Sequence, residues 1–246
     1  MKFRETNLKR ALKNCFLRRK KDFYVIEQHL GLGDHLICIS LIRELVKDTS
    51  KTFYLACLPQ NYHSVTWMFK DLSNLFIFAV SSGREARQYS GFLNAQLLQI
   101  GVNNVDVHRF DAFFYEQHHV PFELRWQNAH VSPGPNSERL YEQLVPNQEK
   151  FMLVCDASSS GKSSGLKIEN PHHLKMIYVF PATNNIFDWT KLILQASEIH
   201  SIDTSFLHLV ENIFYQQPNV PLHYHKTRKT IGHFSRRLPW QEVNYD

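Results

Sequence analysis

Short apolar segments alternate with amphipathic segments along most of the chain. Residues 22–30 (DFYVIEQHL) are rich in β-branched and aromatic side chains and predict a strand, and the following segment carries apolar side chains at helical spacing. The pattern then predicts strands at 52–59 and 75–82, and helices at 61–74 and from Arg84 to about Ile100. Strands that alternate with helices indicate a parallel, doubly wound α/β sheet.

A second alternation follows the segment SPGPNS at residues 132–137, which is the clearest helix- and strand-breaking cluster in the chain. We therefore predict two domains, 1–138 and 139–246. In the second domain the pattern predicts strands at 151–157, 175–182, 198–203 and 220–226, with helices at 187–197 and 205–214. Two consecutive sheets of this kind imply a cleft between them, where ligands of such folds bind.

Composition agrees with a globular protein, since 43% of the 246 residues are hydrophobic and the formal net charge is only +5. No run is apolar enough to predict a membrane span, and the first residues do not resemble a secretory signal, so we expect a cytoplasmic protein. Residues 6–17 predict an amphipathic helix followed by the basic run 18–21. This helix could contact an anionic membrane surface peripherally, or pack on the fold with its charged end in solvent. The cysteines are spread out and are expected to be reduced core residues.

The turn after the first strand reads GLGDHL. A dinucleotide-binding fingerprint would have a third glycine where Leu36 stands and an acid after the second strand, so this signature is incomplete. Gly31 and Gly33 allow a sharp turn, and Asp34 then lies at or near the N-cap of a helix. Its carboxylate could cap the helix, or accept a proton from a substrate hydroxyl.

Two further segments suggest an anion site in the second domain. DASSSGKSS follows a predicted strand but lacks the glycine and the helix of a Walker loop, so we expect no ATPase. Lys162 and Lys167 could still bind a diphosphate, although a solvated loop is equally consistent with this composition. In EIHSIDTSFLHL the helix start offers unpaired amides to phosphate, and its candidate residues are Asp203, Thr204, Ser205 and His208. A capped helix with a core histidine would look the same.

The order of GLGDHL and IDTSFLHL resembles the paired motifs of heptosyltransferase-like, family 9-type glycosyltransferases. The residues that match are Gly33, Asp34, Asp203, Thr204, His208 and Leu209. Ser205 stands where that family has glycine, and Val210-Glu211 replaces a pair of small residues. The resemblance implies a GT-B fold, in which two Rossmann-like doubly wound domains face a cleft: an N-terminal acceptor side and a C-terminal nucleotide-sugar side.

The resemblance also implies a reaction, the inverting transfer of a hexose, deoxyhexose or heptose from a nucleotide diphosphate-sugar. The acceptor would be a hydroxyl of a surface glycan, a polysaccharide precursor or a lipid-linked precursor. Asp34 would be the general base, and Gly33 and His208 belong to the implied donor site. Lys162 or Lys167, with the amides of Thr204 and Ser205, would stabilise the leaving diphosphate without a metal or cofactor. Glu198 is a candidate for the ribose hydroxyls, although a solvated glutamate at the end of a helix is the favoured alternative. The alternative is a non-catalytic nucleotide-sugar or glycan-binding module of the same fold.

Two other classes are not favoured by the sequence. The histidine pairs and the HYH segment have no zinc-motif spacing, so we predict no metal site. The C-terminal tail mixes basic and aromatic residues, but no aromatic stripe runs through the strands, and we expect no nucleic-acid partner.

Overall fold

The computed structural model describes residues 22–102, 106, 108–129, 132–158, 161–214, 218, 220–227 and 234–245. The predicted basic helix at 6–17 and the basic run after it lie outside these residues. The chain forms two compact units, Met1–Ala129 and His130–Asp246, and each is described by itself. Among the described residues no helix is both long and apolar enough to cross a membrane.

The N-terminal unit is built on a parallel sheet with the strand order β3-β2-β1-β4. Its strands are β1 (Phe23–Glu27), β2 (Thr52–Cys57), β3 (Leu75–Ala79) and β4 (Gln96–Gln99). The chain adds β2 and β3 on one side of β1 and then returns to place β4 on the other side. The strand order therefore reverses between β1 and β4, and such a switch point is where ligands bind in doubly wound sheets.

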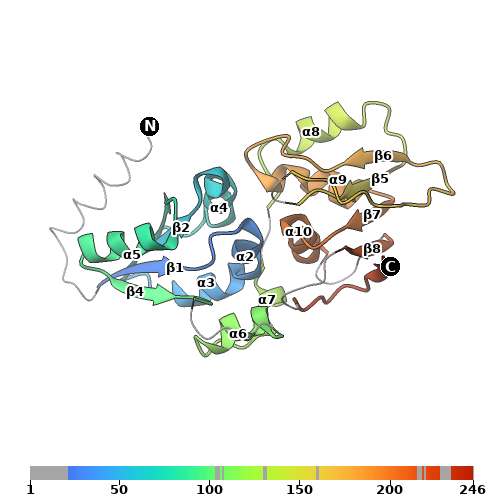
Figure 1. The fold of residues 1–246 in the computed structure, drawn as a ribbon. Coiled ribbons are helices and arrows are strands. Elements are labelled where there is room, and N and C mark those ends of the chain that lie inside the picture. Colours follow the sequence, from blue (N-terminus) through green and yellow to red (C-terminus); the bar gives the residue numbers. More distant parts are fainter. Residues whose placement is uncertain are drawn as a thin grey trace. The chain divides into compact units, whose positions relative to one another are not determined.

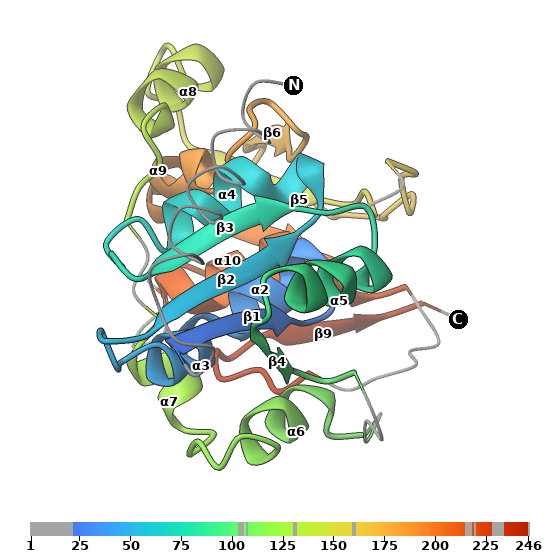
Figure 2. The ribbon, with the colours of Figure 1, turned by 90° about the vertical axis from the view of Figure 1, so that its left-hand side faces the viewer.

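Helices cover both faces of this sheet. Figure 2 shows α5 (Gly83–Phe92) on the near face and α2 (Leu32–Ile37) and α3 (Ile39–Leu45) behind the strands. β2 is buried along its whole length, as a central strand between two helical layers must be. The remaining helical segments are η2 (Pro59–Asn61), α4 (Tyr62–Met68), α6 (Phe110–Glu116) and α7 (Leu124–Gln127).

The predicted helix from Arg84 to about Ile100 is wrong in its second half. α5 ends at Phe92, and Asn94 adopts a left-handed backbone conformation (φ 50°) that cannot continue a helix. The chain then forms β4, which pairs in parallel with β1. This short segment is a strand only because it pairs with β1. The paired residues, such as Val25 and Leu97, are about 70 positions apart in the sequence.

The C-terminal unit contains a second parallel sheet, with the order β6-β5-β7-β8-β9. Figure 1 shows β6, β5, β7 and β8 in this order. The strands are β5 (Phe151–Cys155), β6 (Lys175–Tyr178), β7 (Glu198–Ser201), β8 (Leu222–Lys226) and β9 (Gln241–Asn244). Here the order reverses between β5 and β7, which makes their carboxyl ends the switch point of this unit. The edge strand β9 was not predicted.

The SPGPNS segment belongs to the C-terminal unit. The amide of Gly134 donates to the carbonyl of Phe187 over 2.8 Å, and the amide of Asn136 donates to Oδ1 of Asp188, also over 2.8 Å. The division between the units at Ala129 and His130 thus precedes the breaker cluster, whereas position 138 lies inside α8 (Ser137–Leu144). The other helices of this unit are η3 (Ile186–Trp189), α9 (Thr190–Gln195) and α10 (Ser205–Ile213).

Both units are doubly wound α/β sheets, so the fold class predicted from the sequence is confirmed. Cys38, Cys57 and Cys155 are free and buried, as expected of core residues.

Candidate functional site

Asp34 lies in the first turn of α2, directly beyond the carboxyl end of β1. Gly31 is the N-cap residue, and Asp34 is the third residue of the helix. A Cβ atom on Gly31 would lie 2.5 Å from Oδ2 of Asp34, so the carboxylate lies directly against the glycine. A residue with a side chain at this position would therefore displace the Asp34 carboxylate.

The turn that carries Asp34 is fixed from several sides. Asn61 donates from Nδ2 to the carbonyl of Leu30 over 2.9 Å, and His29 Nε2 lies 2.6 Å from the carbonyl oxygen of Gly101. Each of these contacts comes from a different segment of the N-terminal unit. The turn is thus held at the carboxyl edge of the sheet, next to the switch point between β1 and β4.

His35, the neighbour of Asp34, is completely buried. Its Nδ1 is hydrogen bonded to the side-chain amide of Gln28, and Nε2 has no hydrogen-bond partner among the described residues. Burial lowers the pKa of His35 to about 3, because a charged imidazolium would be desolvated there. The ring is therefore neutral at physiological pH and is part of the support of the turn.

Glu27 is a buried acid at the end of β1 that the sequence analysis did not select. Its Oε1 is paired with Arg87 of α5, and its Oε2 accepts a hydrogen bond from Gln99 of β4 over 2.8 Å. The sequence feature that could have indicated Glu27 is an acidic residue at the last position of an otherwise apolar strand. Because both oxygens are engaged, Glu27 ties α5 and β4 to β1 below the Asp34 turn.

The loop after β5 carries Lys162 and Lys167, and both side chains are exposed. Asp156 shapes the loop, since its Oδ2 accepts from the Ser163 hydroxyl over 2.5 Å and its carbonyl accepts from the amide of Ser164 over 2.8 Å. Lys162 follows the carboxyl end of β5 by seven residues, whereas the main chain of Lys167 contacts the hydroxyl of Tyr245, which is hydrogen bonded to His225 of β8.

The start of α10 contacts the end of β5, the strand that precedes that loop. Thr204 is the N-cap residue, and its hydroxyl lies 3.4 Å from the thiol of Cys155 instead of capping the helix. The amide of Ile202 also donates to the carbonyl of Cys155 over 3.0 Å. Burial raises the pKa of the Cys155 thiol to about 11, so the thiol is neutral and adds no negative charge to an anion site. The start of α10 therefore lies against the last residue of β5, the strand that precedes the lysine-bearing loop.

The other residues of the second motif take different positions. Asp203 is half-buried, and its charge contributes, after burial, to raising the pKa of Tyr224. His208 is buried one turn into α10, with its ring edge-on to Phe234 at 5.0 Å between centroids. His208 thus packs against the C-terminal tail.

Glu211 occupies part of the position of the small residues in the family motif, and it is fully buried. Its carboxylate accepts hydrogen bonds from the amides of Arg237 and Leu238, at 3.0 and 3.3 Å, and from the indole of Trp240 at 2.6 Å. The second turn of α10 therefore fastens the segment that leads into β9.

Glu198 is not brought to the phosphate-binding segments. It is the first residue of β7, whereas Thr204 and Ser205 follow the last residue of that strand. Oε1 of Glu198 lies 3.0 Å from Nε2 of His200 and 2.9 Å from Nε2 of His223. Burial, and then the neighbouring His223, lowers the pKa of His200 to about 4. Glu198 is thus engaged with His200 and His223 near the amino end of the strand.

Comparison with solved structures identifies the fold. The chain is similar to the crystal structure of a glycosyl transferase family 9 protein from Veillonella parvula DSM 2008, with a TM-score of 0.54 and 8% identity over 93% of this chain and 87% of that one. The chain has a family 9-like, GT-B glycosyltransferase fold. It also matches E. coli heptosyltransferase WaaC with ADP-2-deoxy-2-fluoro heptose, with a TM-score of 0.43 and 8% identity over 91% of this chain and 92% of that one. No family model and no curated protein matches the sequence. The resemblance drawn from the GLGDHL and IDTSFLHL motifs is confirmed at the level of the fold.

Proposed function

We propose that this protein is a glycosyltransferase that moves a sugar from a nucleotide diphosphate-sugar to a hydroxyl of a glycan or of its lipid-linked precursor. The observation that carries the proposal is that two distant segments begin at the carboxyl ends of neighbouring strands, at the switch point of the C-terminal sheet. One is the lysine-bearing loop after β5, and the other is the start of α10 with its N-cap Thr204. The fold shared with a glycosyl transferase supports the same reading.

The charges and amides of these segments suit a diphosphate. The first amides of α10 lie at the positive end of the helix dipole, and the Thr204 hydroxyl is directed to Cys155 and does not occupy them. Lys162 and Lys167 add positive charge beyond the neighbouring strand. We propose that these groups stabilise the negative charge that develops on the leaving nucleoside diphosphate, so that transfer needs no metal.

Asp34 is the proposed general base. The acceptor oxygen attacks the anomeric carbon and forms the new glycosidic bond, while the bond from that carbon to the phosphate oxygen breaks. Asp34 takes the proton of the acceptor hydroxyl, and the nucleoside diphosphate leaves with the electron pair. A direct displacement of this kind inverts the anomeric configuration.

Nucleotide binding is tested by thermal unfolding with GDP, UDP, ADP, dTDP, CMP and NAD, each with and without magnesium. At about 100 times the dissociation constant a specific ligand stabilises by about 2.7 kcal/mol, which raises the Tm of a chain of this size by roughly 5–10 °C. We expect such a shift with one nucleoside diphosphate, independent of magnesium. Stabilisation by NAD alone, or by none of the ligands, would refute the proposed donor site.

Lys162→Ala and Lys150→Ala form a matched pair, because the two exposed lysines flank the opposite ends of β5. The loss of a charged contact to phosphate should weaken nucleotide binding about tenfold in Lys162→Ala, whereas Lys150→Ala should bind as the wild type does. Equal binding by both variants would remove Lys162 from the proposed site.

Catalysis is tested with the sugar donor of the nucleotide that binds, by measuring release of nucleoside diphosphate with candidate acceptors. Asp34→Asn should lose roughly 10²-fold or more in turnover while nucleotide binding is unchanged. Asp48→Asn is the control, since Asp48 is an exposed carboxylate near the opposite edge of the same sheet. Nucleotide binding without turnover in the wild type would instead favour the non-catalytic binding module.

A further inference from the structure

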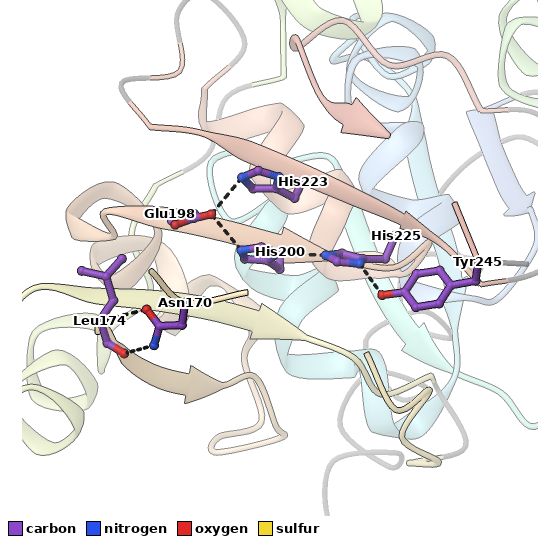
Figure 3. A network of polar contacts seen from close by, with 7 residues as sticks. All are labelled: Asn170, Leu174, Glu198, His200, His223, His225 and Tyr245. Carbon is purple, nitrogen blue, oxygen red and sulfur yellow. Dashed lines mark hydrogen bonds and ion pairs between the residues drawn. The ribbon is translucent and has the colours of Figure 1, made fainter. Parts of the chain in front are cut away.

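A carboxylate and two imidazoles gather on one face of the C-terminal sheet. His200 of β7 and His223 of β8 are partners in the strand register, and Glu198 precedes His200 by two residues. Alternate residues of a strand lie on the same face, so all three side chains project from the same side of β7 and β8. Figure 3 shows Glu198 directed toward both histidine rings.

The three potential ligand atoms are close enough to share one ion. Both Nε2 atoms lie within 3.0 Å of Glu198 Oε1, and all three ligand atoms lie within 4.8 Å of one another. The rings of His200 and His223 are stacked with 4.4 Å between centroids and 9° between planes. Binding of one ion requires the two rings to turn out of this stacked arrangement, so that the in-plane lone pairs of both Nε2 atoms converge on an ion about 2.0–2.2 Å from each ligand atom.

The surroundings resemble the outer shell of a metal site. Nδ1 of His200, the nitrogen that faces away from Glu198, lies 2.8 Å from Nε2 of His225, and Nδ1 of His225 lies 2.7 Å from the hydroxyl of Tyr245. Figure 3 shows this chain continuing from the cluster to Tyr245. Metal-binding histidines characteristically donate their second ring N–H to a fixed partner, which orients the ring and sets its tautomer.

The cluster is also partly shielded from solvent. The side chain of His200 is 6% exposed, and those of Glu198 and His223 are each 18% exposed. A half-buried carboxylate between two imidazoles can be reached by an ion from solvent, and its ligands are kept in place by the sheet. Two imidazoles and a carboxylate form a ligand set that suits Zn²⁺.

We propose that Glu198, His200 and His223 bind one Zn²⁺ ion, with water in the fourth position of a tetrahedral site. The ion bridges β7 and β8. The hydrogen bonds from His200 through His225 to Tyr245 connect the site to the end of β9. The inference goes beyond the proposed transfer reaction and does not depend on it. Glu198 begins β7 whereas the phosphate-binding segments follow the strand, so the ion stabilises the sheet and takes no part in transfer.

The test uses the full chain without a histidine tag, stripped with a chelator and titrated with Zn²⁺ by calorimetry. We expect one ion per chain and a rise in Tm of roughly 5–10 °C at about 100 times the dissociation constant. Titration with Co²⁺ should give the visible absorption of a tetrahedral site with nitrogen and oxygen ligands. The absence of stoichiometric binding, or a Co²⁺ spectrum of octahedral type, would overturn the proposal.

Variants connect the binding to these residues. Glu198→Gln and His223→Gln should abolish the tight site, and His225→Gln should weaken Zn²⁺ binding about 10–100-fold through the outer shell. His172→Gln is the control, because His172 is exposed in a loop outside the cluster. Circular dichroism and the Tm in chelator establish that each variant is folded. Wild-type affinity in folded Glu198→Gln and His223→Gln would show that the ion binds elsewhere.

Discussion

The burial of His35 predicts a specific dependence of stability on pH. Its pKa falls from the ordinary value of 6.5 to about 3 in the folded chain, because burial removes water from the ring. The unfolded chain therefore binds a proton that the folded chain does not, so stability is complete above pH 6.5 and decreases as the pH falls toward 3. From pH 7.5 to pH 5 the free energy of unfolding should fall by about 2 kcal/mol because of this single group.

The measurement is differential scanning calorimetry of the wild type and of His35→Gln at both pH values. His200 and His225 also have lowered pKa values and add a loss of the same sign, so the comparison with the variant isolates the contribution of His35. The Tm of the wild type should fall by about 4–8 °C more than that of the variant over this interval. The variant retains a side-chain amide that can bond with Gln28. Only the change in Tm between the two pH values is compared, so a difference in absolute stability between the two proteins does not enter.

Identical pH slopes for the wild type and His35→Gln would refute the reasoning. That result would mean that the ring accepts a proton in the folded chain at ordinary cost, which a completely buried imidazole with one partner cannot do without local opening. The turn of Asp34 would then be less rigid than its hydrogen bonds indicate.

Two further predictions concern packing, and urea unfolding measures both. Arg125→Leu should destabilise by about 3–5 kcal/mol because it removes the cation of a fully buried ion pair with Asp111, whereas Arg109→Leu removes an exposed ion pair and should cost about 1 kcal/mol or less. Similar losses in both would contradict the burial argument. Gly134→Ala should cost about 1–3 kcal/mol because its Cβ would lie 2.6 and 2.7 Å from main-chain atoms of η3. Gly91→Ala should stabilise by up to about 1 kcal/mol, since its Cβ would meet no atom within 4 Å in the last turn of α5.

The elements that the sequence predicted are those whose pattern is local. β1, β2 and β5 are apolar runs bounded by turn residues, and each is almost fully buried between helices. The GLGDHL turn and the start of α10 were likewise found from residues within one strand–helix junction. The loop after β5 and the start of α10 could be expected at the same edge, since both follow strands of one parallel sheet.

The features that were missed depend on contacts between distant residues. β4 is a strand because of β1, and β9 is a strand because of β8 and the bonds of Glu211 to the preceding tail. Adjacent histidines, which point to opposite faces of a strand, do not predict the cluster around Glu198. The informative pattern was EIH and HYH, in which residues two apart share a face, but only the strand register places the two segments side by side.

The same contacts explain how the second motif departs from that of the family it resembles. The first turn of α10 retains Thr204 at the N-cap, and the Thr204 side chain makes no cap hydrogen bond. The next turn contains Glu211, and a carboxylate is needed there because it is the common acceptor for the amides and the indole of the tail. His208, between them, packs on the same tail through Phe234. Nucleotide recognition by this helix should therefore rest on its first turn and on the lysine loop, while its second turn holds the last strand of the sheet in place.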